Sequence, residues 1–222
     1  MRNLLRCSCR IGLVVLTAAG AVSNAAAHPH VFVDARAEIL FDAQGRMTRV
    51  RHVWEFDRAF SAYAAQGLDT DGNGKLSGKE LAPLAKINVN SLKAYAFFTF
   101  LTVGGERLEF KFPDKYFLDE NSGRLTLHYD LPLRTPTAPG ANTTLEVFDP
   151  EYFVAFTFMK KSPITPSHAP RGCAAAYHPP KPLNAGIMAK LSVIPASQHD
   201  LPQALRDAAV GLANLITVSC PQ

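Results

Sequence analysis

Residues 31–40 read VFVDARAEIL, and apolar side chains alternate there with charged ones. One face of this segment is apolar throughout and carries Val31, Val33, Ala35, Ala37 and Ile39. The opposite face carries Asp34, Arg36 and Glu38. Alternation over this length is typical of a β-strand that buries one of its two faces. The segment therefore predicts a strand at the edge of a hydrophobic core.

The residues that follow predict the second strand of a β-hairpin. A turn sequence, DAQG, occupies residues 42–45, and the alternation resumes over 49–57. Val50, His52, Trp54 and Phe56 share the apolar face of this second strand. Because the other members of that face are apolar, we expect His52 to be a hydrogen-bonded core histidine.

A twelve-residue segment after the hairpin has the ligand spacing of an EF-hand calcium loop. Residues 69–80 read DTDGNGKLSGKE, with a glycine at the sixth position for the sharp turn. The expected calcium ligands are Asp69, Asp71, Asn73, Lys75 through its backbone carbonyl, Ser77 and Glu80. The side chains carry three carboxylates against two lysines, so we expect a weak, extracytoplasmic type of site with a Kd of about 10⁻⁵ to 10⁻³ M.

The rest of the chain alternates short strand patterns with turns. We expect strands at about 99–103, 107–112, 116–118, 124–131, 143–149 and 152–159, and helices at 58–66 and 78–98 with a break near Pro83 and residues 88–90. Residues 160–200 are rich in proline and predict ordered loop. A final helix is expected from the apolar stripe of Leu201, Leu205, Ala208, Leu212 and Leu215.

These patterns indicate an α+β fold that is mainly β. We expect a single sandwich-like or open-barrel domain over residues 28–222, with an EF-hand-like helix-loop-helix inserted at about 58–98 and a C-terminal helix. No repeat or linker divides this stretch, and its length is sufficient for one substantial core.

Residues 1–27 have the features of a secretory signal peptide. Arg2, Arg6 and Arg10 precede an apolar stretch at 11–22, and three alanines at 25–27 form a cleavage site. The apolar stretch is too short to span a bilayer, so we expect a periplasmic or secreted protein that is not embedded in the membrane. Cleavage removes three arginines and no acids, which lowers the formal net charge from +4 to +1. That balance gives no reason to expect a nucleic acid partner.

Two of the four cysteines, Cys173 and Cys220, remain after cleavage. In an oxidising compartment a single pair of cysteines most simply forms a disulfide. The alternative, a thiolate metal site, would need other ligands near them in sequence, and the two cysteines lie in no such cluster.

The expected new amino terminus concentrates ligands for transition metals. A chain beginning at His28 would present an amine and the imidazoles of His28 and His30, which suit Cu, Ni or Zn. Pro29 has no N–H, so a square-planar site that uses deprotonated backbone amides is excluded. A chelate formed by the amine and the His28 imidazole remains, with a third ligand from elsewhere. His128 is placed for a surface site, whereas a trio of His28, His30 and His52 conflicts with the buried face of His52.

Four stretches of the sequence together resemble one bacterial family. They are residues 28–35, the calcium-type loop continuing to 85, residues 95–103 and residues 149–156. In these stretches the chain resembles the DUF1007 proteins, which are often labelled as periplasmic components of an ABC-type transport system. The resemblance implies an extracytoplasmic location. It also implies a membrane metal transporter as a partner, because family members are found beside nickel/cobalt transport proteins.

Two classes of function follow from these observations. The first is a secreted or periplasmic calcium-binding accessory protein associated with metal transport. The alternative is a transition-metal (Cu, Ni or Zn) binding protein, or a copper enzyme, that uses His28. The sequence contains no Gly-x-Ser-x-Gly, His-Glu-x-x-His or phosphate-loop motif, so we assign no catalytic residue and favour the accessory protein. A two-lobed solute receptor is disfavoured by the single β-rich pattern.

The His28 hypothesis predicts that metal affinity depends on a free terminal amine. Mature protein should bind Cu²⁺, Ni²⁺ or Zn²⁺ in calorimetry, and one extra residue placed before His28 should remove most of that affinity. His52→Ala should leave it unchanged. If the extended protein binds equally well, any transition metal must sit elsewhere.

Overall fold

The structure is a computed structural model that describes residues 29–191, 193–194 and 201–221. The expected signal peptide, residues 1–27, and His28 lie outside the described residues. Among the described residues every helix is too short or too polar to span a bilayer.

The first sheet is built around the hairpin predicted from the sequence. Strand β1 (Val31–Phe41) pairs antiparallel with β2 (Met47–Phe56), and Ala35 lies opposite Trp54. Two strands from late in the chain, β8 (Val154–Phe158) and β9 (Ile164–Ser167), pair parallel with successive halves of the other edge of β1. On the far side of β2 lie β6 (Arg124–Thr137) and β5 (Lys115–Asn121), so the order is β5-β6-β2-β1-β8.

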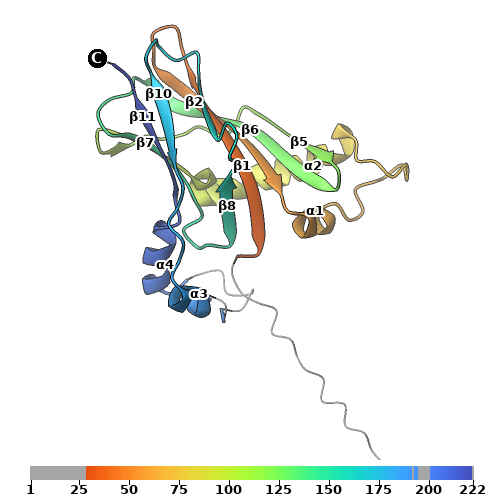
Figure 1. The fold of residues 1–222 in the computed structure, drawn as a ribbon. Helices are drawn as coiled ribbons and strands as arrows, with labels where there is room; N and C mark the ends of the chain where they lie inside the picture. The colour runs from red at the N-terminus through yellow and green to blue at the C-terminus, as the bar shows by residue number, and fades with distance from the viewer. Residues whose placement is uncertain (1–28, 192, 195–200, 222) are drawn as a thin grey trace, which may run out of the picture.

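The second sheet has the order β10-β11-β7-β3-β4. Its strands are β10 (Ala174–His178), β11 (Asn214–Ser219), β7 (Thr143–Val147), β3 (Thr99–Val103) and β4 (Glu106–Arg107). Neither sheet closes into a barrel. The fold is therefore α+β and mainly β, as predicted, and Figure 1 shows the two sheets side by side.

Both sheets contribute to one hydrophobic core. The alternating face of β1 is buried, and Ala35 and Ile39 are fully inaccessible to solvent. Leu101, Leu145 and Ile216 from the second sheet belong to the same cluster of buried side chains. Full burial of a Val, Leu, Ile or Phe side chain contributes about 1.5–3 kcal/mol. Burial of the apolar face of β1 is therefore a main contribution to the stability of this arrangement.

The predicted helix-loop-helix insertion follows β2. Helix α1 (Arg58–Ala64) begins at Asp57, whose Oδ1 accepts from the Phe60 N–H at 2.9 Å. Helix α2 (Gly78–Leu92) begins at Ser77 and packs on β5, with buried residues at a four-residue spacing: Leu81, Ala85 and Val89. Figure 1 shows the loop between these helices at the edge of the molecule, away from α3 (Ala185–Leu191) and α4 (Gln203–Val210).

The break expected near Pro83 and residues 88–90 is wrong, because α2 continues through both places to Leu92. Pro83 is exposed, so the Lys79 carbonyl that loses its helical partner can accept from water instead. The helix ends later, in the short 3₁₀ segment η1 (Lys93–Phe98). There Ala96, Phe97 and Phe98 have φ values of 50°, 55° and 49°, which reverse the chain into β3.

The long C-terminal helix predicted to reach Leu215 is also wrong. Helix α4 ends at Val210, and residues 214–219 form β11, which pairs with both β7 and β10. The segment NLITVS alternates, with Ile216 and Val218 buried in the core. This strand pattern and the leucine stripe overlap in sequence, and two available strand edges decide in favour of the strand.

Two further segments differ from expectation. The predicted strand 107–112 forms only β4 and a single bridge between Phe110 and Leu133. The predicted loop 160–200 contains β9, β10 and α3, with residues 192 and 195–200 outside the described part of the chain. Strand β9 pairs with β1 and β10 pairs with β11. Each partner is distant in sequence, so local patterns do not reveal the pairing.

The predicted disulfide between Cys173 and Cys220 is present. The two cysteines directly flank the paired residues Ala174 and Ser219, so the bond joins the ends of neighbouring strands β10 and β11. The bond therefore links the edge strand of the second sheet covalently to the strand beside it.

Removing this disulfide should destabilise the protein without changing its fold. The sequence separation is 47 residues, for which loop closure contributes about 4 kcal/mol to the free energy of unfolding. We expect that loss for Cys173→Ala combined with Cys220→Ala in urea unfolding, whereas Ser219→Ala, an exposed neighbour, should change little. Equal unfolding midpoints for oxidised and reduced wild type would contradict the prediction.

Candidate functional site

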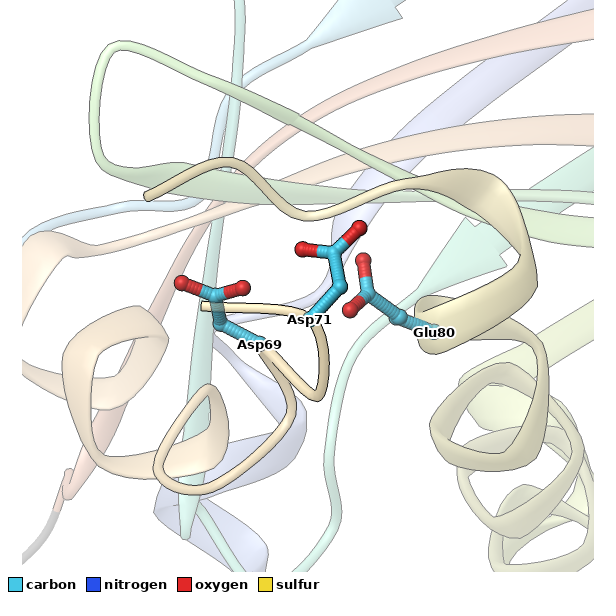
Figure 2. A group of neighbouring side chains, drawn as sticks. All are labelled: Asp69, Asp71 and Glu80. Carbon is cyan, nitrogen blue, oxygen red and sulfur yellow. The ribbon is translucent and has the colours of Figure 1, made fainter. Parts of the chain in front are cut away.

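The calcium-type loop connects α1 to α2, and it brings its carboxylates together. Oxygen atoms of Asp69, Asp71 and Glu80 lie within 4.8 Å of one another. Figure 2 shows the three side chains converging from the loop and from the first turn of α2. Gly72 and Gly74 have positive φ values of 69° and 76°, which let the loop turn tightly between these ligands.

Backbone N–H groups of the loop hold the first two carboxylates in place. Asp69 accepts from Asn73 N–H at 3.1 Å and from Gly74 N–H at 2.9 Å. Asp71 accepts from Asn73 N–H at 3.1 Å and from the Asn73 side-chain amide at 2.8 Å. Asn73 Oδ1 in turn accepts from Lys75 N–H at 2.8 Å. These bonds partly offset the repulsion between like charges that converge.

Glu80 joins the two ends of the loop. Its Oε1 accepts from the Thr70 N–H at 2.7 Å and from the Thr70 hydroxyl at 2.9 Å. Its Oε2 accepts from the Ser77 N–H at 2.9 Å and from the Ser77 hydroxyl at 2.8 Å. Hydrogen bonds from Ser77 and then Thr70 favour the charged carboxylate and lower the pKa of Glu80 to about 2. Glu80 is thus ionised and positioned at neutral pH.

The donor set fits calcium. All the candidate ligand atoms are oxygens, from carboxylates, an amide, a hydroxyl and a backbone carbonyl, and hard cations such as Ca²⁺ and Mg²⁺ prefer oxygen. Neither sulfur nor imidazole is among them. Bidentate coordination by Glu80 would replace some of its bonds to Thr70 and Ser77, so cation binding would exchange hydrogen bonds for metal bonds at the start of α2.

His30 and His128, the described histidines considered for a surface metal site, contact residues outside this loop. The N–H of His30 donates to the Phe153 carbonyl at 2.9 Å, and the two rings are 4.9 Å apart. His128 lies 2.9 Å from Asp119 and stacks on Phe117. The proposed partner of His30, His28, is outside the described residues, so the transition-metal site stays a prediction.

His52 is buried in the core, as predicted. Its Nε2 lies 3.1 Å from the Thr99 hydroxyl, which itself donates to the Phe97 carbonyl at 2.7 Å. Because the single hydroxyl proton of Thr99 is used for Phe97, Nε2 of His52 is the donor in this contact. Burial lowers the pKa of His52 to about 3, so it stays neutral at physiological pH.

The sequence did not reveal an apolar cavity of about 310 Å³ beside the hairpin. Val31, Trp54, Phe98 and Phe156 are among its walls, with Asp149 at its polar side. Asp149 is buried, which raises its pKa, although the N–H groups of Val154, Glu151 and Phe153 bond to it. Three of the four stretches that carry the family resemblance, residues 28–35, 95–103 and 149–156, contribute to this cavity. Their shared resemblance was the sequence feature that could have pointed to it.

The comparisons with known proteins agree with that resemblance. The profile of the family described as "Protein of unknown function (DUF1007)" matches residues 13–220. This chain belongs to the DUF1007 family. The "Uncharacterized 15.5 kDa protein in trpE 3'region" of Spirochaeta aurantia is 32% identical over 96 residues, which cover 43% of this chain and 69% of that protein.

A second relative covers more of the chain at lower identity. An "Uncharacterized protein" of Haemophilus influenzae is 22% identical over 196 residues, or 87% of this chain and 91% of that protein. The descriptions of these two relatives name no ligand or activity. The function must therefore be argued from the site.

The pKa of Glu80 predicts a specific pH dependence in calcium-free protein. Its folded-state pKa of about 2 lies below the ordinary 4.5, so the folded state binds the proton less tightly than the unfolded state. The contribution of Glu80 to stability is complete above about pH 4.5 and is lost as the pH falls toward 2. Glu80→Gln should flatten that part of the stability profile in urea unfolding with chelator present.

The matched control is Glu106→Gln, which changes an exposed carboxylate on β4. It should retain the wild-type slope over the same pH range. An unchanged slope in Glu80→Gln would mean that the hydrogen bonds to Thr70 and Ser77 do not form in solution.

Proposed function

We propose that this DUF1007 protein is a calcium-binding accessory protein that acts outside the cytoplasm. The observation that carries the proposal is the convergence of Asp69, Asp71 and Glu80 within 4.8 Å in a loop with EF-hand spacing. Acidic turns are common on protein surfaces, but here the spacing, the two glycine turns and the position of Glu80 agree with one another.

Calcium in this loop would act as a structural clamp. Glu80 is both a ligand candidate and the third residue of α2, where it forms a capping box with Ser77. The buried side of α2 begins at Leu81, the next residue, and packs into the main core. A cation bound to Glu80 would therefore fix the start of a helix whose opposite face is already held by the sheet.

An extracytoplasmic location is supported by two features of the chain. The disulfide between Cys173 and Cys220 is of a kind that persists in oxidising compartments. Residues 1–27 have the pattern of a signal peptide. Association with a membrane metal transporter is supported only by the family resemblance and belongs to the same proposal.

Calcium titration tests the proposed clamp. With a Kd near 10⁻⁴ M, about 10 mM Ca²⁺ would stabilise the folded protein by about 2.7 kcal/mol. For a domain of this size we expect the Tm of chelator-treated protein to rise by about 5–10 °C. The same concentration of Mg²⁺ should raise it less, because Mg²⁺ demands a stricter octahedral geometry.

The variants Glu80→Gln and Asp69→Asn remove a carboxylate while keeping the side-chain shape. Both should lose most of the calcium-dependent rise in Tm, whereas Glu106→Gln should keep it. If the Tm of the wild type does not respond to calcium, the proposal is wrong, and the loop is a turn held by its own hydrogen bonds.

A further inference from the structure

A second, larger cavity also has residues of the η1 turn in its walls. Its volume is about 630 Å³, and its walls come from η1, β3 and residues 107–112, which pass from the second sheet to the first. Backbone hydrogen bonds fix this crossing segment. Leu108 N–H donates to Leu101, Lys111 N–H donates to Pro132, and Arg134 N–H donates to Glu109, each at 2.8 Å. The cavity is therefore bounded by a backbone that is held on both sides.

The walls of this larger cavity include four phenylalanines: Phe97, Phe100, Phe110 and Phe112. Phe97 and Phe100 are buried, whereas Phe112 is 42% exposed. The rings of Phe97 and Phe112 meet edge to face with centroids 6.2 Å apart. An exposed aromatic ring beside buried ones gives a ligand an apolar surface on which to pack.

The same cavity is strongly cationic. Lys93, Arg107, Lys111 and Arg134 line it against one carboxylate, Glu109, which leaves a net charge of +3. Glu109 pairs with Arg134 at 2.6 Å, and the guanidinium of Arg107 lies 4.4 Å from the centre of the Phe100 ring. Within the described part of the chain, Lys93 and Lys111 make no ion pair and no side-chain hydrogen bond. Two ammonium groups are thus available to an anion.

The backbone beside the cavity is strained. Ala96 and Phe97, both in its wall, have the left-handed conformation, with φ values of 50° and 55°, which is unfavourable for residues other than glycine. The Phe97 carbonyl is held by the Thr99 hydroxyl at 2.7 Å, and Thr99 is held in turn by buried His52. Strain maintained by a buried network is found most often at binding sites.

We propose that this basic cavity binds a small amphipathic anion. The ligand would pack an aromatic or aliphatic body against Phe97, Phe100 and Phe112 and direct a carboxylate, sulfonate or phosphate toward Lys93 and Lys111. The volume falls in the range of small-molecule sites, about 300–1,000 Å³. The excess of positive charge selects an anion over a neutral compound of the same shape.

Two dyes with the same apolar body test the charge requirement. The probe 1-anilinonaphthalene-8-sulfonate carries a sulfonate, and N-phenyl-1-naphthylamine is its uncharged counterpart. Fluorescence titration of the calcium-loaded mature protein should show tighter binding of the sulfonate. Raising NaCl from about 0.05 to 0.3 M should weaken binding of the sulfonate and leave the neutral dye unaffected.

Matched lysine variants locate the binding site. Lys93→Gln combined with Lys111→Gln should weaken sulfonate binding by about fivefold, as expected for ionic contacts from two exposed lysines. Lys86→Gln combined with Lys161→Gln, two exposed lysines outside both the cavity and the calcium-type loop, should have no effect. Circular dichroism of each variant checks that it is folded.

Two results would overturn the proposal. Equal binding of both dyes, with no response to the lysine variants, would place the ligand outside the basic cavity, for instance in the apolar cavity that Trp54 lines. Failure of the sulfonate to bind, together with lysine-dependent co-sedimentation with phosphatidylglycerol vesicles, would show that these lysines contact a membrane surface instead. Neither result depends on whether the calcium loop is occupied.

Discussion

Strand β1 is the constraint on which the rest of this structure depends. It pairs with β2 through the nearest turn in the chain and with β8 and β9 after more than 100 residues have intervened. One face of β1 enters the core while both of its edges are hydrogen-bonded. A central strand of this kind brings early and late segments of the chain together, and its Val31 and Val33 line the apolar cavity.

Features that depend on interactions between residues close in sequence were predictable, and features that depend on distant residues were not. The hairpin and the calcium-type loop were predictable because their patterns lie within a dozen residues and depend on local geometry. The burial of His52 was predictable because its neighbours on the strand face are apolar. The pairing of β9 and β10 was not, since short segments rich in proline become strands only when a distant partner offers an edge.

The error at the C-terminus has the same physical origin. Leucines at 201, 205, 212 and 215 continue a helical stripe, and the sequence alone does not show that β7 and β10 leave a gap between them. Asn214, at the start of β11, is buried and donates to the carbonyls of Val147 and Phe156. A buried amide satisfied by both sheets specifies this register, and no local pattern encodes it. The cationic cavity was missed likewise, because its lysines and phenylalanines come from separated segments.

The disulfide has a consequence for how the folded protein responds to proteolysis. Cys173 and Cys220 enclose the whole segment that carries β10, α3, α4 and β11. A protease that cuts this segment once produces two chains that remain covalently joined. Because β11 lies between β10 and β7, its retention keeps the middle of the second sheet intact, and a nicked molecule can persist in the folded state where an unlinked one would lose a strand.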